Sequence, residues 1–115
     1  MQGRPDEAEP LFQKALILHQ KLFGYEHPDV ALSLNNLAGV YTSQGRYNEA
    51  ESLYLKTIAI AHVTLGMEHP NARTAINNFQ ICLVSAIQAG ETSTLSDHPT
   101  TQAMLKELQE EKAPK

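Results

Sequence analysis

The chain has 115 residues, of which 42% are hydrophobic, and its formal net charge is -4. This length and composition are typical of one globular domain with a small core, and the lack of a basic block argues against nucleic acid or an anionic membrane as a partner. No apolar run approaches the roughly 20 residues of a membrane helix, and the start of the chain lacks the features of a signal peptide, so we expect a cytoplasmic protein.

The first predicted element is an amphipathic helix over residues 5–23. Its apolar residues recur at spacings of three and four, as one face of a helix requires, at Ala8, Leu11, Phe12, Ala15 and Leu16. Gly24 follows the helix, at a position where a left-handed helix end favours glycine. Pro28 stands where a first helical turn needs no amide hydrogen. The segment between them therefore predicts the end of one helix and the start of the next.

The later elements follow the same signals. We expect four more helices, over residues 29–44, 47–65, 70–89 and 99–112. Gly45 predicts a tight turn between two antiparallel helices, and Gly66 with Pro70 repeats the earlier joint. The last helix begins with another His-Pro pair, and we expect it to close the stack.

The chain contains an internal repeat with a period of 42 residues. A shift by this distance gives fifteen identities between residues 2–43 and residues 44–85. Two helices per period predict an all-α fold, a right-handed stack of about five antiparallel helices. We assign residues 1–90 to the repeats, residues 91–98 to a loop, and residues 99–115 to a capping helix and tail.

The repeat is incomplete at both ends. Met1 falls where a turn should join two helices, so the first repeat lacks its first helix. We expect either a piece of a longer array or a chain that borrows the missing surface from another copy. Towards the other end, Ile87 occupies the place of the turn glycine, and Gly90 comes three residues later. Gln80 stands where the earlier copy has Ala38, which predicts a looser or shifted helix crossing.

One stretch of sequence carries a family resemblance, LNNLAGVYTSQGRYNEAESLYLKTIAIAHVTLGMEHPNA. It resembles the tetratricopeptide repeat of the kinesin light chain type, and the likeness covers roughly residues 2–85. The resemblance implies a non-catalytic module that binds a protein or an extended peptide in a concave groove, without a cofactor. The alternative is a structural segment whose exposed helix ends mediate homo-oligomerisation.

The residues that could bind a metal ion or take part in catalysis have structural explanations. Three histidines precede proline at equivalent joints, at His27, His69 and His98. Equivalent positions of packed helices lie roughly 10 Å apart, too far for ligands that each lie about 2 Å from one metal ion. Four acids lie in the first turns of helices, where carboxylates cap and solubilise, at Glu7, Glu9, Glu49 and Glu51. No phosphate loop or nucleophile elbow is present, and the single Cys82 is interpreted as a buried apolar residue.

Two pairs of asparagines in the middle of helices suggest a binding surface, because asparagine is a mediocre helix former. In the family that the chain resembles, the first helix of each repeat lines the groove, and asparagine amides hydrogen-bond the peptide backbone. Asn36 and Asn78 hold the usual clamp position. For Asn35 and Asn77, groove binding and a hydrogen-bond ladder between repeats stay equally open. Seven other residues are expected in the groove, namely Leu32, Gly39, Thr42, Ser43, Arg73, Thr74 and Ile81.

The unpaired first helix also predicts self-association. A helix built for two neighbours but packed on one leaves several large apolar side chains in water, taken from Leu11, Phe12, Leu16, Leu18 and Leu22. We therefore expect a homo-oligomer that forms through this helix or through the region around Gln80. The groove itself is nearly without basic residues, so a preference for acidic peptides is not carried over.

Overall fold

The computed structural model describes residues 5–66 and 68–112, so the expectations for Met1 and for residues 113–115 lie outside it. The described residues form five α helices and one short 3-10 helix, namely α1 (Pro5–Phe23), α2 (Pro28–Ser43), α3 (Tyr47–Thr64), α4 (Pro70–Ala89), η1 (Thr92–Thr94) and α5 (Pro99–Lys112). The predicted all-α fold is confirmed. Every helix begins and ends within one residue of its expected position.

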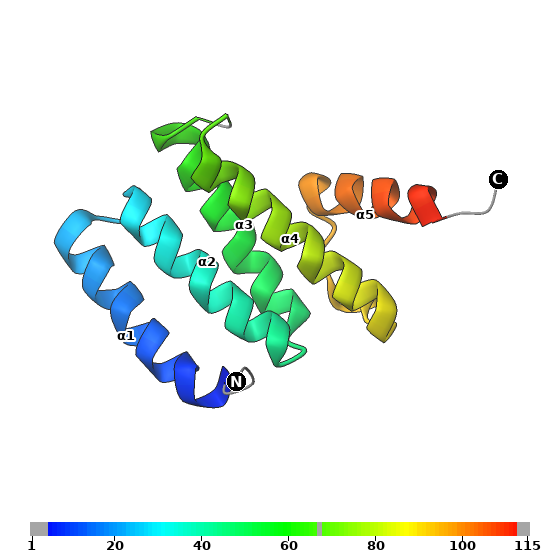
Figure 1. Cartoon of the computed structure of the whole chain (residues 1–115), viewed down its shortest axis with the longest axis horizontal. Helices are drawn as coiled ribbons and strands as arrows, with labels where there is room; N and C mark the ends of the chain where they lie inside the picture. Colours follow the sequence, from blue (N-terminus) through cyan, green and yellow to red (C-terminus); the bar gives the residue numbers. More distant parts are fainter. Residues whose placement is uncertain (1–4, 67, 113–115) are drawn as a thin grey trace.

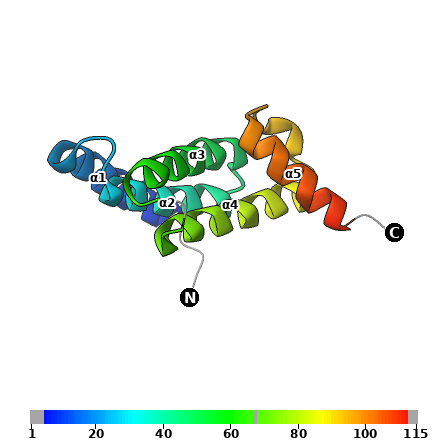
Figure 2. The same cartoon turned by 90° about the horizontal axis from the view of Figure 1, so that it is seen from above.

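The helices are arranged in two layers. Helices α2 and α4 lie in one layer, and α1 and α3 lie in the other (Figures 1 and 2). Helix α2 contacts α1, α3 and α4, and α3 contacts α4. This is the stack of antiparallel helix pairs that the period predicts. Helix α5 contacts α4 and runs obliquely to the other four helices (Figure 1).

The three His-Pro joints share an N-cap that the sequence reasoning did not identify. In His27, His69 and His98, the ring Nδ1 accepts a hydrogen bond from the backbone N–H two residues later, at 3.0, 3.0 and 3.1 Å. Such an acceptor satisfies one of the free amides of the first helical turn. Histidine therefore recurs before proline because it caps a helix. The position of each histidine directly before a proline in the first turn is the signal that could have revealed this role.

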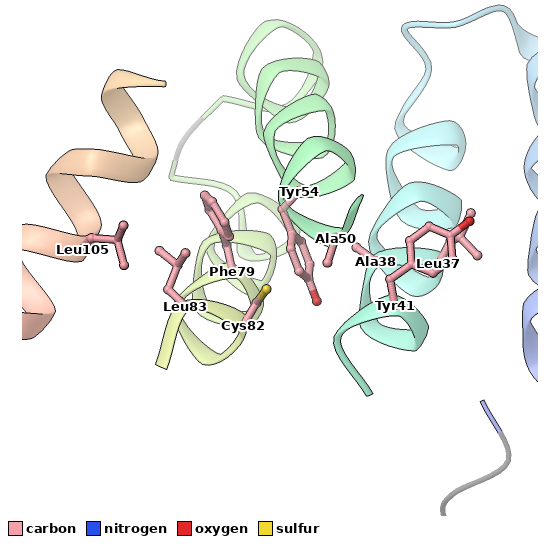
Figure 3. Packing of buried hydrophobic residues seen from close by; sticks show 9 residues of the cluster. All are labelled: Leu37, Ala38, Tyr41, Ala50, Tyr54, Phe79, Cys82, Leu83 and Leu105. Carbon is pink, nitrogen blue, oxygen red and sulfur yellow. The ribbon is translucent and has the colours of Figure 1, made fainter. Parts of the chain in front are cut away.

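The main core joins four helices through nine buried residues (Figure 3), which are Leu37, Ala38, Tyr41, Ala50, Tyr54, Phe79, Cys82, Leu83 and Leu105. The ring of Phe79 is fully buried and stacks on Tyr54 with centroids 5.6 Å apart. Cys82 is also fully buried, as expected, and burial raises the pKa of its thiol. A second cluster packs α2 against α3 through Val30, Ala31, Leu34 and Ile60.

The end of the stack departs from the regular repeat. Helix α4 has 20 residues where α2 has 16, because it continues through Ile87 to Ala89 and is capped by Gly90. Gln80 is exposed, so the crossing that buries Ala38 in the earlier repeat is not formed here. Leu105 of α5 instead packs beside Leu83 (Figure 3). Helix α4 therefore packs on α5 through Leu83 and not through position 80.

Glu51 contradicts its interpretation as a capping and solubilising acid. It is only 2% exposed, and its carboxylate accepts hydrogen bonds from three donors. The backbone N–H of Ser96 lies at 2.9 Å, the hydroxyl of Thr101 lies at 2.6 Å, and the hydroxyl of Ser96 donates as well. The sequence argument failed because it considered only the distance of Glu51 from the helix start. The buried carboxylate fastens the segment before α5, and the first turn of α5, to α3.

Glu9, one period before Glu51, makes the corresponding connection between α1 and the turn after α2. Its carboxylate accepts hydrogen bonds from Gln44 at 3.1 Å and from Arg46 at 3.1 Å. The bonds from Gln44 and Arg46 lower the pKa of Glu9, and the bond from Arg46 lowers the pKa of Glu49. Lowered carboxyl pKa values favour the fold at neutral pH, and this contribution is lost as the pH falls through them.

Candidate functional site

The residues predicted to form a groove lie on α2 and α4, and none of them is fully buried. Seven are exposed, namely Leu32, Asn36, Ser43, Arg73, Thr74, Asn77 and Ile81. Four are partly buried, namely Asn35, Gly39, Thr42 and Asn78. The core residues of both helices occupy the opposite stripes. We call the solvent-facing surface where Leu32, Asn35, Thr74 and Asn78 come together the α2–α4 face, and we include in it Asn36 and Gly39 from the same side of α2.

Two of the four asparagines meet across the boundary between the helices. The side-chain N–H of Asn78 donates to the side-chain oxygen of Asn35 at 3.4 Å. The bond joins the first asparagine of one pair to the second asparagine of the other, which the period alone does not indicate. The amide N–H groups of Asn35 and the amide oxygen of Asn78 take no part in this bond, and they lie next to each other. The pair thus retains both donors and an acceptor.

A small depression lies beside this pair, between the first turns of α2 and α4. Leu32, Asn35 and Thr74 line it, and Thr57 and Ala61 of α3 contribute to its lining. Its volume is about 50 Å³, far below the roughly 300–1,000 Å³ of small-molecule sites. The depression therefore suits one small side chain better than a cofactor.

Further along α2, the α2–α4 face lies close to a buried tyrosine. A Cβ placed on Gly39 would lie 3.9 Å from the hydroxyl oxygen of Tyr54, an ordinary van der Waals distance. The hydroxyl of Thr42 donates to the carbonyl of Ala38 at 2.9 Å. Burial raises the pKa of Tyr54, and the neighbouring Thr42 hydroxyl partly offsets this change. Thr42 is therefore occupied by its own helix and by the core, and it is less available to a ligand than predicted.

Other predicted residues lie apart from this surface. Asn77 and Ile81 line a second, open depression on α4 that also includes Leu108 of α5. Arg73 is exposed but lines neither depression, and Ser43 lies at the last position of α2. The structure thus brings Leu32, Asn35, Thr74 and Asn78 together, and it places Asn77 in a different depression.

The site has few charged side chains and few groups that could bind a metal ion. Asp29 and Arg73 are the only charged residues in α2 and α4. Within residues 5–66 and 68–112, no group of three or more His, Cys, Asp or Glu side chains is placed to hold a metal ion. Over the same ranges, no helix has the length and apolar character needed to cross a membrane. The α2–α4 face can therefore act by hydrogen bonding and by apolar contact.

Comparison with known proteins identifies the repeat. A family model described as tetratricopeptide repeat matches residues 1–62 and, in a second overlapping match, residues 29–85. The two matches together extend over well more than half of the chain. No curated protein matched the sequence.

Proposed function

The chain belongs to the tetratricopeptide-repeat family, whose helical repeats generally mediate protein–protein interaction, and from this premise we propose that its α2–α4 face binds an extended peptide. The peptide is a segment of another protein, held as in the kinesin light chain type of repeat. The proposed contacts are hydrogen bonds from the asparagine amides to the peptide backbone. We place the protein in the cytoplasm, and the proposal requires neither catalysis nor a cofactor.

The Asn35–Asn78 pair is the observation that carries the proposal. Each side chain is partly buried at the line where the two helices meet, and they are joined at 3.4 Å. A peptide group offers one N–H and one carbonyl oxygen, and the free groups of this pair are complementary to both. Asn36, the next residue along α2, is exposed. The mutual hydrogen bond therefore orients the amides for a ligand as well as linking the repeats.

The surroundings of the pair favour a neutral ligand. Arg73 is the only basic residue in the two helices, and it does not line the depression beside the pair. That depression accommodates a small side chain next to Leu32, which is 55% exposed. We propose a short peptide without acidic residues, bound with an affinity in the micromolar range, because two helices offer far less area than a standard interface of about 1,600 Å². Its affinity should depend little on salt.

Replacing Asn36 with alanine should weaken peptide binding by about 1–3 kcal/mol, which is roughly 5- to 150-fold in affinity. The exposed side chain makes no contribution to the core, so the unfolding midpoint should stay unchanged. The measurement is a fluorescence anisotropy titration with neutral peptides selected from a display library. Asn77→Ala is the matched control, because this exposed asparagine lines the other depression, and its affinity should equal that of the wild type.

Variants of the same kind distinguish peptide binding by the asparagines from a purely structural hydrogen bond between the repeats. Asn78→Ala removes both the bond to Asn35 and the proposed peptide contact. Under the proposal it lowers affinity and costs only a little stability. A ladder without a binding role would give the reverse result, namely lower stability for Asn35→Ala and Asn78→Ala while the wild type binds no peptide. That result would reject the α2–α4 face as a binding site.

Gly39→Ala tests the site without removing any hydrogen bond. The added methyl carbon would lie 3.9 Å from the hydroxyl oxygen of Tyr54, which is an ordinary contact distance. Alanine is also favoured over glycine inside a helix by about 1 kcal/mol. The variant should therefore be as stable as the wild type or more stable. If the peptide backbone passes close to Gly39, the methyl group should reduce its affinity at least about tenfold, which the same titration measures. A variant that is more stable and binds equally well would place the peptide elsewhere.

A further inference from the structure

A stripe of apolar side chains runs along the outer face of α1, and we call it the α1 stripe. It consists of Ala8, Leu11, Ala15, Leu18 and Leu22. The three leucines are 66%, 54% and 64% exposed. A single exposed leucine on a surface needs no explanation, but three on one face of one helix form a contiguous apolar surface.

The internal repeat shows how such a stripe is normally covered. One period later, Ala50, Leu53, Thr57 and Ile60 hold the same positions in α3. Ala50, Thr57 and Ile60 are at most 8% exposed. The hydroxyl of Thr57 reaches the carbonyl of Ala31 in α2, and Ile60 shares a buried cluster with residues of α2. A stripe of this composition is therefore suited to packing against another helix.

The spacing of the α1 stripe points to a helix as its partner. Its residues follow one another at intervals of three, four, three and four, the pattern of a seam between two packed helices. The order is small, large, small, large, large. Two such stripes that run in opposite directions, aligned centre to centre, place Ala15 beside its own copy. They place Leu11 opposite Leu18 and Ala8 opposite Leu22, so that a small residue meets a large one at each end.

The charges of α1 favour the same antiparallel arrangement. Asp6 and Glu7 lie in its first turn and Lys21 lies in its last turn. In an antiparallel pair, the acidic end of one helix lies beside the basic end of the other, and the helix dipoles oppose each other. Lys14 would lie near its own copy at the centre, but it is exposed and its long side chain can extend into water.

We propose that the α1 stripe is the contact between two copies of this chain, joined by antiparallel pairing of their α1 helices. The contact is isologous, because each copy uses the same surface and the pair closes on itself. It leaves the α2–α4 face of both copies open, since α1 lies in the other layer (Figure 2). The proposal stands independently of peptide binding, and it would present two peptide sites in one assembly.

Leu18→Glu tests the contact. Both copies lose a large apolar side chain from the stripe and gain a carboxylate there, so the dissociation constant of the dimer should rise at least about a hundredfold. Sedimentation equilibrium of the full chain over a concentration series should show a dimer for the wild type and a monomer for the variant. Val63→Glu is the matched control, because Val63 is 66% exposed on α3, and this variant should remain a dimer. Circular dichroism should give the same helix content for all three proteins.

Cysteine cross-linking tests the orientation of the pair. The native Cys82 is fully buried, so the wild type should not cross-link under mild oxidation. Ala15→Cys should form a covalent dimer, because residue 15 lies at the centre of the antiparallel pair. Leu22→Cys should not, since the two copies of residue 22 would lie about 21 Å apart along the helices, beyond the reach of a disulfide. Cross-linking through both positions would indicate a parallel pair.

Two other results would overturn the proposal. A wild-type monomer at every concentration, with no covalent dimer from Ala15→Cys, would leave the α1 stripe to a helix of a different protein or of another repeat. A dimer that survives Leu18→Glu would place the contact elsewhere, with the region around Gln80 as the next surface to test. Peptide affinity measured on the same variants keeps the two proposals apart, because Leu18 lies outside the α2–α4 face.

Discussion

Replacing Phe79 with alanine should lower the free energy of unfolding by about 3–5 kcal/mol. The ring is fully buried, it stacks on Tyr54 of α3 at 5.6 Å, and it belongs to the cluster that also includes Leu105 of α5. Its removal leaves a cavity where three helices meet. Because domains of this size are stable by about 5–15 kcal/mol, the variant should lose a large part of its stability. Urea denaturation followed by circular dichroism measures the change.

Ile81→Ala is the control for this experiment. Ile81 lies in the same helix, two residues away, but it is 61% exposed. Its truncation should change stability by less than about 0.5 kcal/mol. Equal losses from the two variants would mean that α4 does not pack through Phe79 as described.

Glu51→Ala should cost about 2–4 kcal/mol. The buried carboxylate accepts hydrogen bonds from the backbone and hydroxyl of Ser96 and from the hydroxyl of Thr101, which is fully buried. Without Glu51, the buried hydroxyl of Thr101 loses its acceptor. The loss should be concentrated in α5, whose amides should exchange hydrogen faster than those of α2 and α3. Hydrogen exchange with mass spectrometry, together with chemical denaturation, measures both effects.

Two companions show whether the acceptor is what matters. Glu51→Gln keeps the size of the side chain but replaces one acceptor oxygen with a donor. Its free energy of unfolding should therefore lie between those of the wild type and the alanine variant. Glu9→Ala changes the corresponding residue of the earlier repeat, which is still partly open to solvent, and it should cost clearly less. If Glu9→Ala and Glu51→Ala are equally destabilising, the attachment of α5 does not depend on the buried carboxylate.

Much of the fold could be predicted because its signals are local and occur twice. Gly24 and Gly66 both adopt the left-handed backbone that ends a helix, with φ of 84° and 83°. The proline that ends each joint stands at the first position of the next helix, where no amide hydrogen is needed. These preferences depend on the backbone of a few neighbouring residues, so they can be recognised without knowledge of the partner helix. The burial of Cys82 was expected from the residue type, because a single cysteine behaves as a small apolar residue.

The candidate site was predicted only in part. The period places Asn35 with Asn77 and Asn36 with Asn78, but the hydrogen bond joins Asn35 to Asn78. Two equivalent residues point in the same direction from their own helices, so a residue on one helix meets a partner from a different position on the next. Asn77 therefore lines another depression, together with Leu108 of α5. A repeat indicates which positions are equivalent, but it does not indicate which of them are in contact.

The position and length of the helices, the glycines that end them and their pairing in a repeat follow from the order of the residues alone. The fate of the polar groups does not, as the two equivalent acids demonstrate. Glu9 meets the Gln-Gly-Arg turn of the following repeat, whereas Glu51 meets Ser96 and Thr101, because α4 continues past the place where that turn would form. Both contacts join residues more than 30 positions apart, and the angle at which one helix crosses another determines whether such groups come within hydrogen-bonding distance. That angle depends on the packing of all the side chains between the two helices.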